Sequence, residues 1–254
     1  MEIINEPKNS PKSISTKEKV AIYKTLNAQY ESRMVGKGVD LSNRDEFVLH
    51  WTLLMDIANT NLANEGKRWI VDENNREIMR FLLFYFNNSP RLNECFCGNQ
   101  HSLHKNLLIC GGVGAGKTKL FQIFSEYCKL TKNSRFFHNL SVTQMVNYYK
   151  INSHLDKYTY AELGSTNFEG KPVSVCLNDV GLQTHFHFGT DTKVLIDDFF
   201  HARNEIWTNQ NKFTHITTNL TPSELKSHFT DEFGRLTDRL KTYNIIHLKG
   251  ESRR

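Results

Sequence analysis

The stretch from Leu107 to Thr118 constrains the fold of this chain more than any other. It reads Leu-Leu-Ile-Cys-Gly-Gly-Val-Gly-Ala-Gly-Lys-Thr. The apolar run that ends at Cys110 predicts a short buried strand, and the run that starts at Gly111 fits the pattern G-x-x-x-x-G-K-[ST]. Apolar residues then recur at the spacing of one helix face, at Leu120, Ile123, Phe124, Tyr127 and Cys128. A strand, a glycine-rich loop and a helix in this order predict a loop that binds the phosphates of a nucleotide.

Each residue type in this loop suits a phosphate. Glycines let the backbone turn so that successive N–H groups point at an anion, and Lys117 supplies a charge near the β- and γ-phosphates. The hydroxyl of Thr118 is a candidate ligand of Mg²⁺. The sequence therefore predicts binding of ATP or another nucleoside triphosphate by Gly111, Gly112, Val113, Gly114, Ala115, Gly116, Lys117 and Thr118.

Size and composition allow a large core and favour a cytoplasmic protein. The chain has 254 residues, and its net charge of +5 is compatible with a nucleic-acid partner but too small to identify one. No apolar run is long enough to span a membrane, and the first residues do not form a signal peptide, so we expect no membrane association. The 5 cysteines lack the spacing of a disulfide framework and favour a reducing compartment.

The chain before residue 66 is predicted to be helical. Periodic apolar residues predict helices over 17–34, 47–62 and 72–86, and Asn87-Asn-Ser-Pro is expected to end the third. We place a boundary near residue 66, with a helical region at 1–66 and a nucleotide-binding domain at 67–254.

From residue 107 onward, short apolar runs alternate with helical patterns, which is typical of an α/β fold with a parallel sheet. We expect three layers, with helices on both faces of the sheet. The predicted strands are 107–110, 135–138, 173–177, 213–217 and 245–248. The predicted helices are 117–130, 141–150, 191–208, 222–228 and 231–240.

Two of these strands end in polar residues that could act on a bound nucleotide. The strand at 173–177 leads into Asn178 and Asp179, and the strand at 213–217 leads into Asn219. Carboxyl ends of parallel strands meet at one edge, so these side chains should lie near the phosphate loop. The alternative for Asn219 is that it only starts a turn or caps the following helix.

Arginines follow on a predicted helix at Arg235 and Arg239. Pairs of this kind are usually solvated or form salt bridges, and the spacing alone does not indicate catalysis.

Taken in order, these elements give the chain a resemblance to a known family. The phosphate loop is followed by Asn178-Asp179-Val180-Gly181, Thr217-Thr218-Asn219-Leu220 and Arg235-Leu-Thr-Asp-Arg239-Leu240. This order resembles the AAA+ ATPases of the DnaC-type helicase-loader and IstB-type transposition-helper group, over roughly residues 105 to 254.

The resemblance implies a role for each matched position. Gly111 to Thr118 would form the Walker A loop, and Asn178 and Asp179 the Walker B pair that holds Mg²⁺. Asp179 would also be catalytic, by orienting the attacking water, and Asn219 would be sensor 1. Arg239 would be the arginine finger that reaches the ATP of the next subunit in an ATP-dependent homo-oligomer. Arg254, near the end of the chain, matches the sensor 2 arginine, and no sizeable C-terminal lid is expected.

Asn178 departs from the family pattern. With Gly181 fixing the alignment, Asn178 falls where the family has a Mg²⁺-organising aspartate, and an amide carries no charge toward the cation. ATP binding should survive, and weak hydrolysis is expected. Shifting the alignment by one residue makes Asp179 the metal ligand and places Val180 at the catalytic acid.

Three functions remain open at this stage. The resemblance favours a helicase loader of DNA replication that oligomerises on single-stranded DNA. It implies that the helical region at 1–66 is the partner-binding region and binds a replicative DNA helicase. The alternatives are a transposition helper that binds duplex DNA, and an adaptor that binds ATP without hydrolysing it. A small-molecule kinase fits less well, because it has no evident use for the Thr-Thr-Asn element or the paired arginines.

One cluster outside these motifs could hold zinc. It consists of Cys95, Cys97, His101 and His104. Cys-x-Cys is tighter than the usual zinc knuckle and no second half is nearby, so we favour an ordinary polar loop.

Overall fold

The computed structural model describes residues 15–34, 39–96, 100–160, 172–181, 186–187, 190–229 and 235–253. The chain divides into two compact units, which are treated separately. The first comprises residues 1–103 and 122–136, and the second comprises residues 104–121 and 137–254. The boundaries between the two units do not coincide with residue 66, where the sequence predicts the end of a partner-binding region.

The first unit is helical, as expected. It contains α1 (Thr16–Met34), α2 (Arg44–Ala63), α3 (Arg76–Phe86), the 3-10 helix η1 (Pro90–Glu94) and most of α4 (Lys117–Leu130).

Helix α3 begins four residues later than the predicted start at residue 72. The carboxylate of Asp72 accepts hydrogen bonds from the N–H groups of Asn74 at 2.9 Å and Asn75 at 3.1 Å. Those bonds fix a turn ahead of the helix. The predicted end is correct, because α3 stops before Asn87 and Asn88 takes a φ of 56°.

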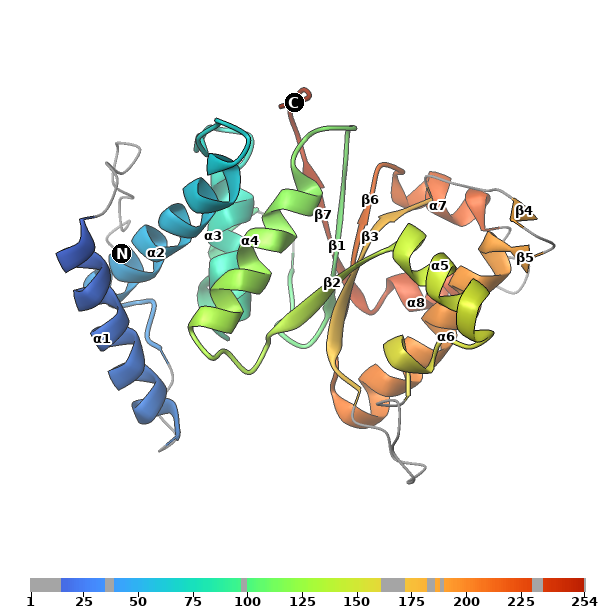
Figure 1. The fold of residues 1–254 in the computed structure, drawn as a ribbon, viewed down its shortest axis with the longest axis horizontal. Coiled ribbons are helices and arrows are strands. Elements are labelled where there is room, and N and C mark those ends of the chain that lie inside the picture. The colour runs from blue at the N-terminus through green and yellow to red at the C-terminus, as the bar shows by residue number, and fades with distance from the viewer. Residues whose placement is uncertain are drawn as a thin grey trace. The chain divides into compact units, whose positions relative to one another are not determined.

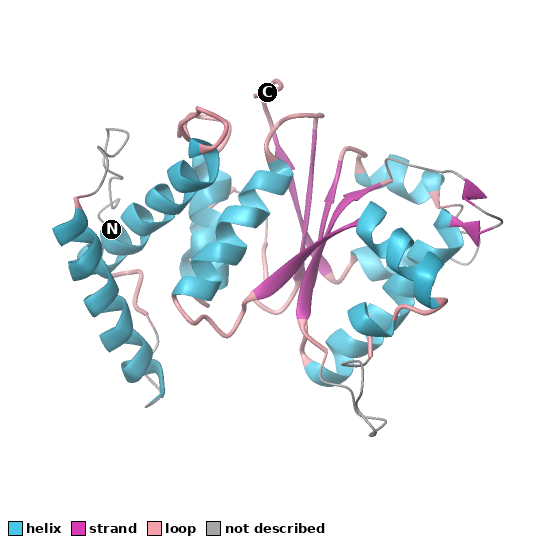
Figure 2. Ribbon diagram, in the orientation of Figure 1, coloured by secondary structure: helices cyan, strands magenta, loops and turns pink. Residues whose placement is uncertain are grey.

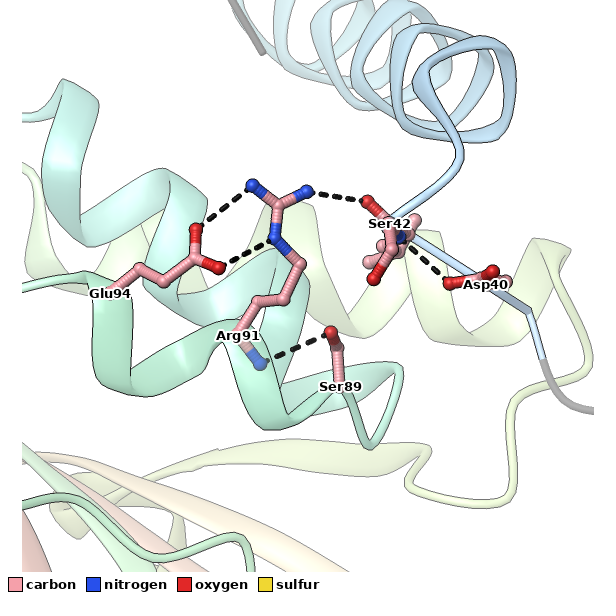
Figure 3. A network of polar contacts seen from close by, with 6 residues as sticks. Asp40, Ser42, Ser89, Arg91 and Glu94 are labelled. Atoms are coloured by element: carbon pink, nitrogen blue, oxygen red, sulfur yellow. Dashed lines mark hydrogen bonds and ion pairs between the residues drawn. The ribbon is translucent and has the colours of Figure 1, made fainter. Parts of the chain in front are cut away.

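Arg91 ties η1 to the loop that precedes α2 (Figure 3). Its guanidinium forms a two-pronged contact with Glu94, with Nε–Oε1 at 3.0 Å and Nη2–Oε2 at 2.8 Å. Its Nη1 donates to the carbonyl of Leu41 at 2.9 Å. The hydrogen bond from Arg91 lowers the pKa of Glu94. One side chain thus connects segments fifty residues apart within this unit.

The second unit is built on a five-stranded sheet (Figure 2). The strands are β1 (Asn106–Gly111), β2 (Phe137–Ser141), β3 (Ser174–Val180), β6 (Thr214–Thr218) and β7 (Tyr243–Leu248). Their order is β2-β3-β6-β1-β7, and all neighbours pair in parallel. Every strand therefore ends at the same edge, and β1 lies between β6 and β7.

Helices flank this sheet, so the predicted α/β fold with a parallel sheet is confirmed. Helices α5 (Val142–Asn152), α6 (Thr192–Gln210) and α8 (Arg235–Leu240) lie on one face (Figure 1). On the other face, Phe121 from the first turns of α4 contacts the rings of Phe137 and His215. Successive side chains of each strand point to opposite faces of the sheet.

The remaining elements are short. They are the 3-10 helix η2 (Asp156–Tyr158), helix α7 (Pro222–His228) and a hairpin of β4 (Phe186–His187) and β5 (Thr190–Asp191), and the hairpin was not predicted. Strand β2 starts two residues later than expected, because the side chain of Asn133 accepts from the N–H of Arg135 and holds a turn there. Of the helix predicted over 231–240, the structure describes 235–240.

A buried arginine joins α6 to the sheet. Arg203 is 1% exposed, and its guanidinium donates to the hydroxyl of Thr214 and to the carbonyls of Val173 and Phe213. Burial lowers the pKa of Arg203 to about 10, so it remains charged at neutral pH. These bonds fix α6 at the edge where the strands begin.

None of the described helices combines the length and the apolar character needed to cross a bilayer.

Candidate nucleotide-binding site

The predicted strand, loop and helix are present at the carboxyl edge of the sheet. Strand β1 ends at Gly111 and α4 starts at Lys117. Gly114 has a φ of 79° and Gly116 a φ of 100°, values that L side chains rarely adopt. The first N–H groups of α4 have no acceptor within the helix, and together with the helix dipole they suit an anion. The loop therefore has the backbone that phosphate binding requires.

Lys117 lies in the centre of this site. Its side chain is buried, and Nζ donates to the carbonyls of Gly111 and Gly112, each at 2.8 Å. It also donates to Oδ1 of Asn219 at 2.5 Å. An ammonium group has three donors and no acceptor, so polar oxygens are its natural partners when no phosphate is bound. The structure thus brings Lys117 and Asn219 together, as the sequence predicts.

Asn219 does not cap the helix that follows it, which was the alternative. Thr221 is the N-cap of α7, and it forms a capping box with Glu224. Strand β6 pairs directly with β1, with Thr218 opposite Cys110, so the next residue along β6 lies beside the loop. The adjacency of the two strands explains the position of the Asn219 amide.

Asn178 faces the same side of the sheet as the start of α4. Its amide is buried, with Nδ2 donating to Oδ1 of Asn139 at 3.2 Å and Oδ1 accepting from the hydroxyl of Thr217 at 3.2 Å. Both partners come from neighbouring strands. Oδ1 also accepts from the thiol of Cys176 at 3.7 Å, so both of its lone pairs have a partner and a cation would have to displace one of them.

Asp179 lies in an irregular part of β3. Its φ is 64°, and the pairing of β3 with β6 shifts between Leu177 and Val180. The N–H of Asp179 donates to the hydroxyl of Thr217 at 2.9 Å. Asn178 is buried and Asp179 is half-buried, so the two residues have different environments at this edge.

The donors present fit a nucleotide with Mg²⁺. Thr118 follows Lys117 at the start of α4 and is half-buried. A hydroxyl, a carboxylate and an amide oxygen are the hard oxygen ligands that Mg²⁺ prefers. The assignment of Thr118, Asn178 and Asp179 as metal residues remains a prediction.

A contact missed at the sequence level lies on the outer side of the loop. The N–H of Arg253 donates to the carbonyl of Gly114 at 3.0 Å, and the side chain of Ser252 lies where a Cβ on Gly114 would be. A Cβ on Gly111 would in turn collide with the carbonyl of Leu248. Two loop glycines are thus required by packing, Gly111 against the end of β7 and Gly114 against the segment that follows it. Arg254, the predicted sensor 2 residue, lies outside the described residues.

Arg239 lies far from its own phosphate loop. It lies in α8, four residues before the first residue of β7, and that residue pairs with Asn106 at the start of β1, whereas the loop follows Gly111 at the other end. A rise of about 3.3 Å per residue separates these ends by about 17 Å. The Arg239 guanidinium contacts Asp197 on α6. The backbone of Arg235 begins α8.

The possible zinc cluster finds no support among the residues described. They contain no group of three or more metal-binding side chains, and Cys97 lies outside them. Burial raises the pKa of Cys95 to about 12, so its sulfur stays protonated. His101 packs edge-on against the ring of Phe81. Cys95, Cys110, Cys128 and Cys176 are buried free thiols.

No family model matches this chain, and no curated protein matches it. Some solved structures are similar to part of this chain. AMPPCP-bound DnaA from Aquifex aeolicus is 20% identical over 72% of this chain and 49% of its own, with a TM-score of 0.46. Domain III of the replication initiation protein DnaA from Thermotoga maritima is 20% identical over 71% of this chain and 65% of its own, at 0.45.

A protein assigned provisionally as a primosome component of Streptococcus pyogenes serotype M3 is 16% identical over 72% of this chain and 84% of its own, with a TM-score of 0.47. The chain spans about half of the Aquifex protein.

Proposed function

We propose that this chain binds ATP with Mg²⁺ and acts in DNA replication as a helicase loader, assembling into a homo-oligomer on single-stranded DNA. The observation that carries the nucleotide part is the position of Lys117, buried between two loop carbonyls and the amide of Asn219. Its charge lies where the backbone and the helix start favour an anion. The replication part rests on the ordered motifs and their family resemblance.

In this proposal, the backbone of Gly111 to Thr118 and the ammonium of Lys117 hold the triphosphate. Thr118 and the pair Asn178 and Asp179 hold Mg²⁺, which would neutralise phosphate charge when bound. When phosphate binds Lys117 in place of Asn219, the amide of Asn219 is released and orients the attacking water. Arg254 is proposed to contact the nucleotide from the end of the chain.

The position of Arg239 supports its action on a second subunit, because it cannot reach the loop of its own chain. We expect Arg239→Ala to leave ATP binding by the monomer nearly unchanged and to weaken ATP-dependent assembly or turnover. For turnover the expected loss is about 10³-fold or more, the usual size of an arginine-finger effect on kcat. Nucleotide titration at low protein concentration measures ATP binding by the monomer, and sedimentation at high protein concentration measures assembly. Loss of ATP binding by the monomer would show that Arg239 serves its own site.

The partner is tested by mixing the full chain with the replicative helicase of its own host. We expect a complex that elutes as one species with ATP and separates without it. The same samples should bind single-stranded DNA more tightly with ATP than without, and the logarithm of affinity should fall linearly with the logarithm of salt concentration. The Lys117→Ala variant is the control for nucleotide dependence.

Other outcomes would favour the alternatives. A clear preference for duplex DNA would favour the transposition helper. ATP-dependent assembly without DNA binding and without turnover would favour the adaptor. The adaptor is the second candidate function because the amide of Asn178 brings no negative charge to the metal.

A further inference from the structure

Two side chains of α6 hold the guanidinium of Arg239. Its Nη1 donates to Oδ1 of Asp197 at 2.8 Å, and its Nη2 lies 3.2 Å from Nδ1 of His201. A guanidinium has donors only, so Nδ1 of His201 must accept, which requires the neutral ring. Asp197 and His201 are four residues apart and share one face of α6. Together they fix both ends of the arginine fork.

The side chain of Arg239 is mostly buried, although the side chains of its two partners on α6 are exposed to solvent. The side chain of Arg239 is 10% exposed, whereas those of Asp197 and His201 are 46% and 66% exposed. An arginine that stabilises phosphate charge on another molecule must present its N–H groups to that molecule. In the single chain these groups point into α6 instead. Arg239 therefore has to leave Asp197 before it can act in trans.

We propose that Asp197 is a positioning residue that restrains Arg239 in the unassembled chain, and that docking of a second copy exchanges this carboxylate for the triphosphate bound to that copy. The inference rests on the proposed function of Arg239. The exchange is favourable because a triphosphate carries several negative charges and Asp197 carries one. It is also feasible, because an ion pair with a half-exposed carboxylate is weak and easily screened.

The assembly test compares two neighbouring aspartates. Asp197→Asn removes the charge that faces Arg239, and Asp198→Asn is the matched control on the exposed next position of α6. With ATP present, we expect Asp197→Asn to lower the protein concentration of half-assembly by about two- to fivefold, the range of a weak ion pair. Asp198→Asn should match the wild type, and Asp197→Asn combined with Arg239→Ala should behave like Arg239→Ala alone. A higher half-assembly concentration in Asp197→Asn would overturn the inference, because Asp197 would then present Arg239 rather than restrain it.

A second readout does not depend on assembly. Phenylglyoxal modifies accessible arginines, and peptide mass mapping of the nucleotide-free monomer reports Arg239 separately. We expect Arg239 to react several times faster in Asp197→Asn than in the wild type or in Asp198→Asn, with unchanged thermal unfolding. If Arg239→Ala impairs assembly but Asp197→Asn changes neither reactivity nor assembly, the proposed function stands and the restraint is wrong. If Arg239→Ala both assembles and turns over ATP like the wild type, the trans role is wrong and the inference falls with it.

Discussion

Replacing Lys117 by alanine is expected to abolish useful nucleotide binding. In the free chain, the Lys117 ammonium is satisfied by two loop carbonyls and Asn219. Phosphate replaces these dipoles with full negative charges, so the lysine contributes more to the bound state than to the free one. Losing a charge-assisted contact should cost about 1.5–3 kcal/mol, or about tenfold to 150-fold in Kd.

The measurement is the Kd of ATP–Mg²⁺ by calorimetry or a fluorescent analogue. Lys119→Ala is the matched control, since it removes a positive charge two residues further along α4 and leaves Lys117 in place. Thermal unfolding without nucleotide separates a binding defect from a folding defect. An unchanged Kd and unchanged function in Lys117→Ala would contradict the assignment of this loop.

Replacing Asn178 by aspartate is expected to raise ATP turnover. A carboxylate at this position adds a full negative charge that fixes Mg²⁺ and its waters, and groups of this kind commonly change metal affinity or activity by about 10- to 100-fold. The amide group now donates to Asn139, and a carboxylate cannot. Without Mg²⁺, the variant should therefore lose stability by about 1–3 kcal/mol, because two oxygens would face each other in a buried site.

Steady-state turnover and thermal unfolding, each with and without Mg²⁺, measure both parts of this prediction. Asp179→Asn is the companion variant. If wild-type turnover is already normal, Asn178→Asp changes nothing and Asp179→Asn abolishes it, then Asp179 holds the metal and the alignment is shifted by one residue. Asn178 and Asp179 are adjacent but form hydrogen bonds with different partners. We therefore expect Asn178→Asp and Asp179→Asn to have different effects.

The local structure could be predicted because its causes are local. The glycine-rich loop requires positive φ values, and Gly114 and Gly116 have them. Helical periodicity located α4 over its full range and α7 likewise. The start of α3 was misplaced because the side chain of Asp72 forms a turn there, which apolar periodicity does not detect.

Proximity in the candidate site was only partly predictable. A parallel sheet places all carboxyl ends at one edge, which was sufficient to expect Asn219 near the loop. The separation of Arg239 from its own loop needed the pairing of β7 with β1. The buried charge of Arg203 had no signal, because an isolated arginine on a helix usually lies in solvent.

By itself, the sequence determined the phosphate loop, the alternation of strands and helices and the polar residues at two strand ends, since each depends on residues close together in the chain. Only the tertiary structure decided that Lys117 donates to Asn219, that the N–H of Arg253 donates to the carbonyl of Gly114 and that Arg239 donates to Asp197. Those contacts join residues far apart in the chain. They exist because strand order and close packing fix which segments meet, and no local pattern of residues encodes that choice.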